Sequence, residues 1–108
     1  MKHSINKLDQ SLNVEVDGDI LSTTQEKLRQ SLMSLLGSAE ITSANWNVLK
    51  LDLTRTAMID SAGLNLLVSL IKLVKDRGAR VAATISSTSV QRTFLFTRLD
   101  RQMEITMA

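Results

Sequence analysis

The side chains in this chain that could most readily take part in chemistry are those of the run Asp60-Ser61-Ala62-Gly63-Leu64. This run lies between Val48–Leu53, which we expect to be a buried strand, and a stretch from Asn65 onward with helical periodicity. At the start of a helix, backbone N–H groups lack helical partners and the helix dipole is positive. A phosphate is well accommodated there, so Ser61 is a candidate phosphorylation site.

A simpler interpretation of an Asp-Ser pair is that it caps the helix. Aspartate and serine side chains accept hydrogen bonds from the free N–H groups of the first turn, which stabilises a helix by about 1 kcal/mol. Taken alone, residue types favour this structural role over a regulatory one. Both roles are compatible, and we expect Ser61 to be the cap and the phosphorylation site at once. The small residues Ala62 and Gly63 would let a kinase cleft approach the hydroxyl closely.

Composition excludes several classes of function. A chain of 108 residues is expected to form one domain, residues 1–108, and the lack of cysteine excludes disulfides, thiolate metal sites and a cysteine nucleophile. A net charge of +2, scattered arginines and only one Trp and two Phe argue against nucleic-acid binding. The apolar-rich run Leu64–Val74 is too short to span a bilayer, and no secretory leader opens the chain. We therefore expect a cytoplasmic protein without membrane insertion.

The residues give little support to an enzyme. The one histidine, His3, lies in a terminus that we expect to be frayed, so neither a Ser-His-acid triad nor a histidine metal site is expected. Asp52 and Asp60 could be imagined as a magnesium pair, but a strand-end acid and a helix cap are the commoner roles for two loosely spaced carboxylates. Gly63 stands in no phosphate-binding glycine motif. We expect no catalytic residue, no metal and no cofactor.

The elements that must position Ser61 follow from periodicity and turn residues. The predicted order is two strands, helix, strand, helix, strand, helix and a short last strand, which is an α/β domain with a mixed sheet of about four to five strands and three to four helices. In the first half we expect an alternating strand through Leu12, Val14 and Val16, a helix from a capping box at Thr23–Glu26 to Gly37, and a polar connection over 38–45. In the second half we expect a strand Trp46–Leu53, a helix Ser61–Arg77 ended by Gly78, a strand Arg80–Ile85, a helix capped within Ser86–Ser89 with Val90, Phe94 and Leu95 as its apolar residues, and a strand near Glu104–Met107.

The helix after Ser61 is apolar over more than one face. One stripe comprises Leu64, Leu67, Val68, Ile71 and Val74, and a second comprises Leu66, Leu70 and Leu73. A helix on a sheet usually needs one stripe about 100° wide. Either a neighbouring helix covers the second stripe, which is the simpler explanation, or part of it is a partner surface beside Ser61.

Across the chain, the motifs resemble the STAS family, named for sulfate transporters and anti-sigma factor antagonists. The resemblance rests on Leu49-x-Leu51-Asp52-Leu53, Ile59-Asp60-Ser61-Ala62-Gly63-Leu64, Leu67 and Gly78, and continues in Val90-x-x-x-Phe94, Arg98-Leu99-Asp100 and Glu104-Ile105. It spans nearly the whole chain from Leu12. The core run is short, but after a strand ending in Leu-Asp-Leu-Thr it is fairly specific.

The resemblance implies a bacterial anti-sigma factor antagonist that acts as a protein–protein switch. In such systems the unphosphorylated antagonist binds an anti-sigma factor that is also a serine kinase, phosphorylation of the motif serine releases it, and a serine phosphatase reverses the modification. Transferred to this sequence, Ser61 is the phosphorylation site. The partner-binding residues are then Asp60, Ser61, Ala62, Gly63, Leu64 and Asn65, together with Asp19 and Ser22 in the earlier loop.

Two points leave alternatives open. Many family members carry an acid after Gly-x-Leu/Ile in the earlier loop, whereas Gly18-Asp19-Ile20 is followed here by Leu21. Asp19 or Ser22 could compensate for that acid. The sequence from Ala62 to Gly78 is also similar to small STAS subunits of phospholipid-trafficking ABC transporters. Serine rather than threonine after Asp60, and the Arg98-Leu99-Asp100 ending, favour the antagonist.

Overall fold

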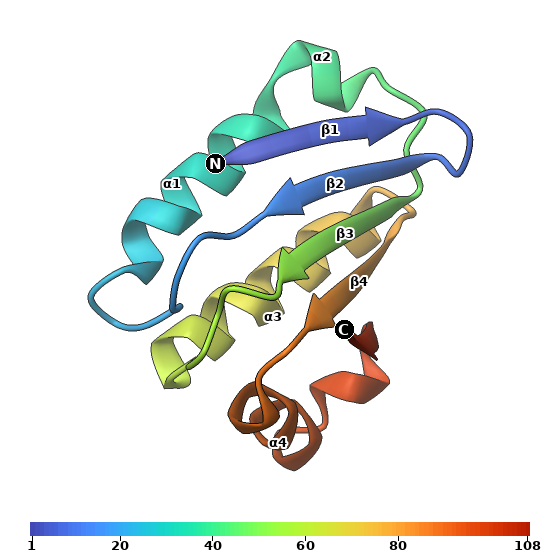
Figure 1. Cartoon of the computed structure of the whole chain (residues 1–108). Coiled ribbons are helices and arrows are strands. Elements are labelled where there is room, and N and C mark those ends of the chain that lie inside the picture. The colour runs from blue at the N-terminus through green and yellow to red at the C-terminus, as the bar shows by residue number, and fades with distance from the viewer.

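A computed structural model describes all residues, 1–108, as a five-stranded sheet with helices packed against it (Figure 1). The strands are β1 (Lys2–Asn6), β2 (Ser11–Glu15), β3 (Val48–Leu53), β4 (Arg80–Ile85) and β5 (Glu104–Met107). The helices are α1 (Gln25–Gly37), α2 (Ala39–Thr42), α3 (Ser61–Asp76) and α4 (Thr88–Phe96), with a 3-10 turn η1 (Leu99–Arg101). The predicted α/β class is confirmed, and so is the element order apart from α2 and η1, which were not predicted.

The sheet has the simple order β1-β2-β3-β4-β5. β1 pairs with β2 antiparallel, and the other neighbours are parallel, so the sheet is mixed as predicted. The parallel crossover from β3 through α3 to β4 places the loop that leads to Ser61 at the carboxyl end of β3. Ligand and partner sites in parallel sheets commonly lie at this edge.

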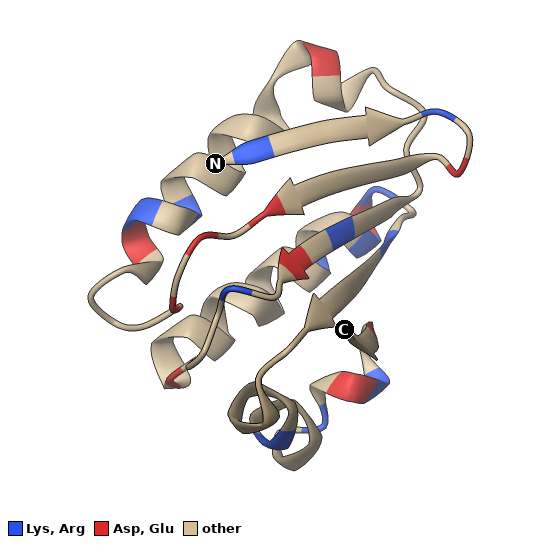
Figure 2. Ribbon diagram, viewed as in Figure 1, with Lys and Arg blue, Asp and Glu red and all other residues tan.

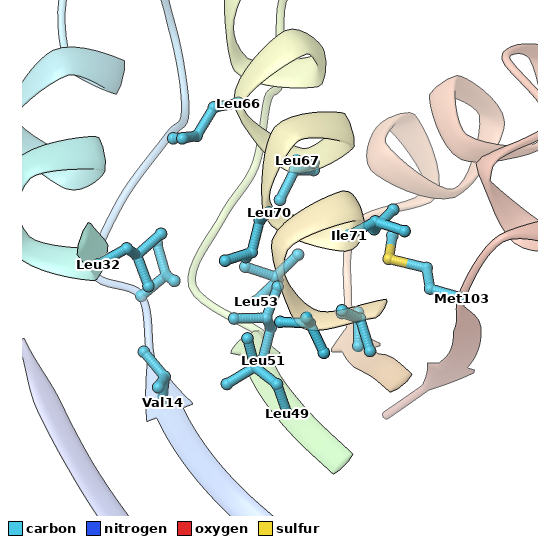
Figure 3. Close-up of a cluster of buried hydrophobic side chains, with 14 of the residues drawn as sticks. Val14, Leu32, Leu49, Leu51, Leu53, Leu66, Leu67, Leu70, Ile71 and Met103 are labelled. Carbon is cyan, nitrogen blue, oxygen red and sulfur yellow. The ribbon is translucent and has the colours of Figure 1, made fainter. Parts of the chain in front are cut away.

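One face of the sheet and the helices enclose a core of 24 buried hydrophobic residues. Figure 3 shows Leu49, Leu51 and Leu53 of β3 beneath side chains of α3, with Val14 of β2 and Leu32 of α1 beside them. These β3 residues point to one side because alternate strand residues face opposite sides of a sheet. The core therefore fixes the position of α3, and with it the start of that helix.

The second apolar stripe of α3 is buried for most of its length. α1 and α3 lie side by side behind the sheet (Figure 1), and Leu66 and Leu70 are fully buried. Leu73, at the far end of the stripe, remains 45% exposed. Leu66 and Leu70 are too enclosed to contact a partner, so the partner-surface explanation is excluded for these two residues.

The opposite face of the sheet carries no helix and is polar. Across it, Asn13, Lys50, Ala82 and Glu104 are in register, as are Glu15, Asp52, Thr84 and Thr106. The Lys50 ammonium pairs with the Asp9 carboxylate at 2.8 Å. No helix of the structure has the length and apolar character needed to cross a membrane.

Two predictions near the N-terminus are wrong. His3 is part of β1, not of a frayed end, because the backbone of this polar segment pairs with β2. α1 begins at Gln25 with Thr24 as N-cap, and no side chain caps it. The Thr24 hydroxyl instead accepts from the Leu21 N–H at 2.9 Å and donates to the Asp19 carbonyl at 2.8 Å, so it organises the loop before the helix.

The connection after α1 also differs from the prediction. Gly37 remains within the helix, and residues Ala39–Thr42 form α2, whose Ile41 is buried in the core. Helix α3 ends within one residue of the predicted position. Gly78, which follows the end of the helix, has a φ of +87°, a conformation that favours glycine. Strand β3 begins at Val48, two residues after the predicted start.

Candidate functional site

The loop β2–α1 (residues 16–24) and the loop β3–α3 (residues 54–60) run side by side at the carboxyl edge of the sheet. Ile20 and Ile59 form an isolated parallel bridge. The Ile20 N–H donates to the Met58 carbonyl at 3.1 Å, and the Asp60 N–H donates to the Ile20 carbonyl at 3.2 Å. The two loops are thus a parallel extension of the sheet, and Ser61 follows directly after it.

Asp60, and not Ser61, is the N-cap of α3. One carboxylate oxygen, Oδ1, accepts from the Gly63 N–H at 2.9 Å, as an N-cap side chain does. The other, Oδ2, accepts from the Ser22 N–H at 2.8 Å. These backbone N–H groups lower the pKa of Asp60 below its usual value. The expectation that Ser61 caps α3 is therefore wrong, because the N-cap is the adjacent residue Asp60.

Asp19 makes the reciprocal contact from the earlier loop. Its Oδ1 accepts from the Ala57 N–H at 2.8 Å and from the Met58 N–H at 3.1 Å. The buried Thr56 hydroxyl adds a hydrogen bond to the Gly18 carbonyl at 2.8 Å. Each loop thus supplies one carboxylate to the backbone of the other. Sequence reasoning named Asp19 and Asp60 but missed this pairing, because no local pattern links residues about 40 positions apart.

Gly63 lies where the loop β2–α1 crosses the first turn of α3. A Cβ atom at this position would lie 2.2 Å from the Ile20 carbonyl oxygen and 2.9 Å from side-chain carbons of Ile20 and Ile59. Only glycine allows this approach without displacing backbone. Gly63 is buried, so its role visible in the structure is to let the two loops meet.

Ser61 is the first residue of α3, and its side chain is exposed. Its hydroxyl makes no hydrogen bond within the chain, in contrast to Ser69 of the same helix, whose Oγ donates to the Asn65 carbonyl at 3.0 Å. Ser22 and Asn65 are also exposed, while Ala62, Leu64 and Leu21 are half-buried. The loops therefore bring the eight predicted partner-binding residues to one edge of the molecule, with a free hydroxyl among them.

The surroundings of this edge are acidic and include the start of α4. Figure 2 shows acidic residues in both loops and at the ends of β2 and β3. Ser87, the N-cap of α4, accepts from the Val90 N–H and donates to the Ala57 carbonyl at 3.1 Å, which ties α4 to the loop β3–α3. Met58 in that loop is 54% exposed.

Another acid near the site, Asp52, has its own partners. Its Oδ1 accepts from the Thr54 hydroxyl at 2.6 Å and from the Thr54 N–H at 3.0 Å, and these bonds lower the pKa of Asp52. Asp52 and Asp60 are thus engaged separately, as strand-end acid and helix cap. No group of three or more His, Cys, Asp or Glu side chains is placed to hold a metal ion.

Comparison with known proteins agrees with this architecture. A model of the STAS domain family matches residues 3–108. A crystal structure of a candidate anti-sigma factor antagonist of Thermotoga maritima, TM1081, superposes with a TM-score of 0.79 at 20% identity and covers 97% of this chain and 84% of that one. An anti-sigma factor antagonist of Mycobacterium paratuberculosis gives 0.75 at 19% identity, with coverage of 97% and 84%. The antagonist SpoIIAA in its unphosphorylated form gives 0.69 at 14% identity, with coverage of 97% and 88%.

Proposed function

The chain belongs to the STAS domain family, and on that premise we propose that it is an anti-sigma factor antagonist controlled by phosphorylation of Ser61. Its unphosphorylated form binds an anti-sigma factor that is also a serine kinase. Phosphorylation releases that partner, and a serine phosphatase restores binding. The protein acts by binding and catalyses no reaction itself. This role places it in the bacterial cytoplasm with its partners.

The observation that supports this proposal best is that Asp60, and not Ser61, caps α3. The Asp60 carboxylate caps α3 and accepts a hydrogen bond from the Ser22 N–H. The Ser61 hydroxyl is exposed and makes no hydrogen bond that modification would break. A kinase can therefore modify it without breaking a contact of the fold. The structural neighbours that share the fold include anti-sigma factor antagonists.

Electrostatics explain how modification would release a partner. A phosphate adds a charge of about −1.5 to −2 at Ser61, next to the carboxylate of Asp60. Within a partner interface, a unit charge brought about 4 Å from a like charge costs about 1 to 4 kcal/mol, the lower value for a water-like and the higher for a surface-like dielectric constant. Since 1.4 kcal/mol corresponds to about tenfold in affinity, this repulsion is enough to release a micromolar complex. The domain itself need not refold.

A binding experiment with a candidate anti-sigma kinase tests the proposal. We expect Ser61→Ala to bind as the wild type does, and Ser61→Asp to bind about tenfold or more weakly. The matched control is Ser69→Asp, which places the same charge on the same helix two turns further on. Equal weakening by Ser61→Asp and Ser69→Asp would point to net charge and contradict a local switch.

Phosphate mapping tests the modification directly. After incubation with the kinase and ATP, mass spectrometry should locate the phosphate on Ser61, and Ser61→Ala should abolish incorporation. Modification of Thr54, Thr56 or Ser69 instead would contradict the assignment. Stable binding to an ABC-transporter ATPase, unaffected by Ser61→Asp, would favour the transporter-subunit alternative.

A further inference from the structure

We propose that the exposed side of α4 and the turn after it form a second docking surface, which binds an acidic amphipathic helix of a partner protein. The surface consists of Arg92, Leu95, Phe96 and Arg98, and we call it the α4 surface. It is separate from Ser61, which lies at the start of a different helix. The proposal does not depend on the function proposed above.

The α4 surface exposes large apolar side chains that the fold does not use. Phe96 is 91% exposed and Leu95 is 55% exposed, whereas Val90 and Phe94 on the other side of the helix are fully buried. Arg92, Leu95 and Phe96 stand at i, i+3 and i+4 and therefore share one face of α4. Together with Thr93 and Thr97 they line a shallow depression. An aromatic ring this exposed beside a depression is typical of a protein-binding site.

The charge around these apolar side chains has one dominant sign. Arg92, Arg98 and Arg101 are all exposed, and none of them takes part in an ion pair. Asp100 is the single acidic residue between Thr88 and Met103. Figure 2 shows basic residues on α4 and on the turn that follows it. An apolar centre with a basic rim is complementary to a segment that carries apolar residues on one face and carboxylates beside them.

The backbone at Arg98 gives an independent reason to assign this arginine a role beyond stability. Arg98 has φ 61° and ψ 25°, the left-handed conformation in which a helix commonly ends with glycine. A side chain at this position is strained, yet the residue is an arginine that is exposed to solvent and follows Phe96 by two residues. Strain of this kind is often kept at functional sites. A requirement for a cation next to the exposed Leu95 and Phe96 would explain why an arginine is kept in this strained conformation.

A helical protein segment fits the α4 surface better than a membrane does. Recognition of anionic lipid headgroups usually uses clusters of about four to eight Lys and Arg residues, and the α4 surface and η1 together offer three. A helix that lays apolar residues onto the Leu95 and Phe96 side chains could place carboxylates within reach of Arg92 on one side and Arg98 on the other. The partner is thus defined by acidic residues flanking an apolar stripe.

Titration of the full, isotope-labelled chain with designed peptides tests this proposal by NMR. The probe is a peptide of about four helical turns with leucines on one face and glutamates elsewhere, and its counterpart has lysines in place of the glutamates. We expect the acidic peptide to shift the amide signals of α4 and η1 and the basic peptide to leave them unchanged. Phe96→Ser should weaken binding about tenfold. The control Leu8→Ser, which removes an apolar side chain that is 98% exposed in the β1–β2 turn, should not.

Arg98→Gly separates a docking role from a structural one. We expect this variant to unfold at a higher urea concentration, because glycine adopts the left-handed conformation without strain, and at the same time to bind the acidic peptide several-fold more weakly. Higher stability with unchanged binding would overturn the role of Arg98. Ser61→Asp should leave peptide binding unchanged. The proposal for the α4 surface can therefore be tested independently of the proposed switch at Ser61.

Other occupants give different results and would overturn the proposal. Equal binding of the acidic and basic peptides would show that the surface binds apolar side chains nonspecifically, without selection by charge. Binding to vesicles of phosphatidylglycerol and phosphatidylcholine that Phe96→Ser abolishes would identify a membrane contact. Self-association in sedimentation that the same substitution abolishes would identify a second copy of this chain as the occupant.

Discussion

The carboxylate of Asp60 accepts a hydrogen bond from the backbone N–H of Ser22 at 2.8 Å, and this contact joins two residues that are 38 positions apart in the sequence and lie in different loops. The same carboxylate caps α3 through Gly63. Asp60 therefore couples the position of the loop β2–α1 to the start of the helix that carries Ser61. Protonation or substitution of the Asp60 carboxylate therefore affects both loops of the candidate site.

The first prediction concerns pH. The hydrogen bonds from Gly63 and Ser22 lower the pKa of Asp60, so the folded state favours the ionised carboxylate. The resulting stability is fully present above the unfolded-state pKa of about 3.9 and is lost as the pH falls through the lower folded-state pKa. Urea unfolding of the wild type and of Asp60→Asn should show this. Asn keeps one oxygen to cap the helix but does not titrate.

We expect the wild type to lose more stability than Asp60→Asn as the pH falls below about 4, because only the wild type titrates at this position. Asp9 and Asp52 also have lowered pKa values and contribute equally to both proteins, so their effect cancels in the comparison. A constant difference in the free energy of unfolding over this range would contradict the role assigned to Asp60.

The second prediction concerns the close approach at Gly63. Gly63→Ala should destabilise the fold by about 1 to 3 kcal/mol or more, because its methyl group would lie 2.2 Å from the Ile20 carbonyl oxygen and backbone must move. The matched control is Gly37→Ala, at the end of α1, where a Cβ meets nothing within 4 Å. That variant should be neutral or more stable by up to about 1 kcal/mol. Chemical denaturation of both variants measures the contrast, and equal effects would exclude a specific clash.

Much of this architecture could be predicted where local pattern and packing agree. Helix α3 was predicted well because its apolar periodicity extends over four turns and Gly78 follows it. Strand β4 was predicted with its observed bounds, since its alternation is bounded by turn residues. The mixed sheet could be predicted because the βαβ crossover requires parallel strands, whereas the two strands that begin the chain are joined by a short turn and pair antiparallel.

The remaining features depend on contacts between distant residues. β1 contains one apolar residue, Ile5, and exists because its backbone pairs with β2. Asp60 and Ser61 are equally good N-cap residues by type, and the Ser22 N–H and the Ile20 carbonyl decide between them. The reciprocal contact of Asp19 with Ala57 and Met58 likewise has no local signal. The candidate site could therefore be located from the sequence, but its internal hydrogen bonds could not.

The third prediction concerns the clasp between Arg77 and Trp46. The guanidinium carbon of Arg77 lies 4.0 Å from the centroid of the Trp46 ring, and its nitrogens donate to the carbonyls of Thr42 and Ala44. Arg77→Met should cost about 1 to 3 kcal/mol, because a cation–π contact and charged hydrogen bonds are lost. Arg77→Lys should recover only part of this, since one ammonium cannot reproduce the planar contact and both carbonyl bonds.

Trp46 is the only tryptophan of the chain, so its fluorescence reports on this clasp alone. We expect its emission to shift to longer wavelength in Arg77→Met under native conditions, as the segment after α2 loosens and the ring meets more water. Unchanged emission and stability in both Arg77 variants would show that the contact is incidental. The clasp is distant from Ser61 in the fold, so partner binding should be unaffected.

The fourth prediction separates helix capping from regulation. Ser61→Ala should change the free energy of unfolding by less than about 0.5 kcal/mol, because Asp60 caps α3 and the Ser61 hydroxyl makes no hydrogen bond. The matched comparison is Ser87→Ala, which removes the oxygen that caps α4 through the Val90 N–H and also the bond to the Ala57 carbonyl. That change should cost about 1 to 2 kcal/mol. Thermal and urea unfolding measure both variants, and a cost for Ser61→Ala as large as that for Ser87→Ala would return Ser61 to a structural role.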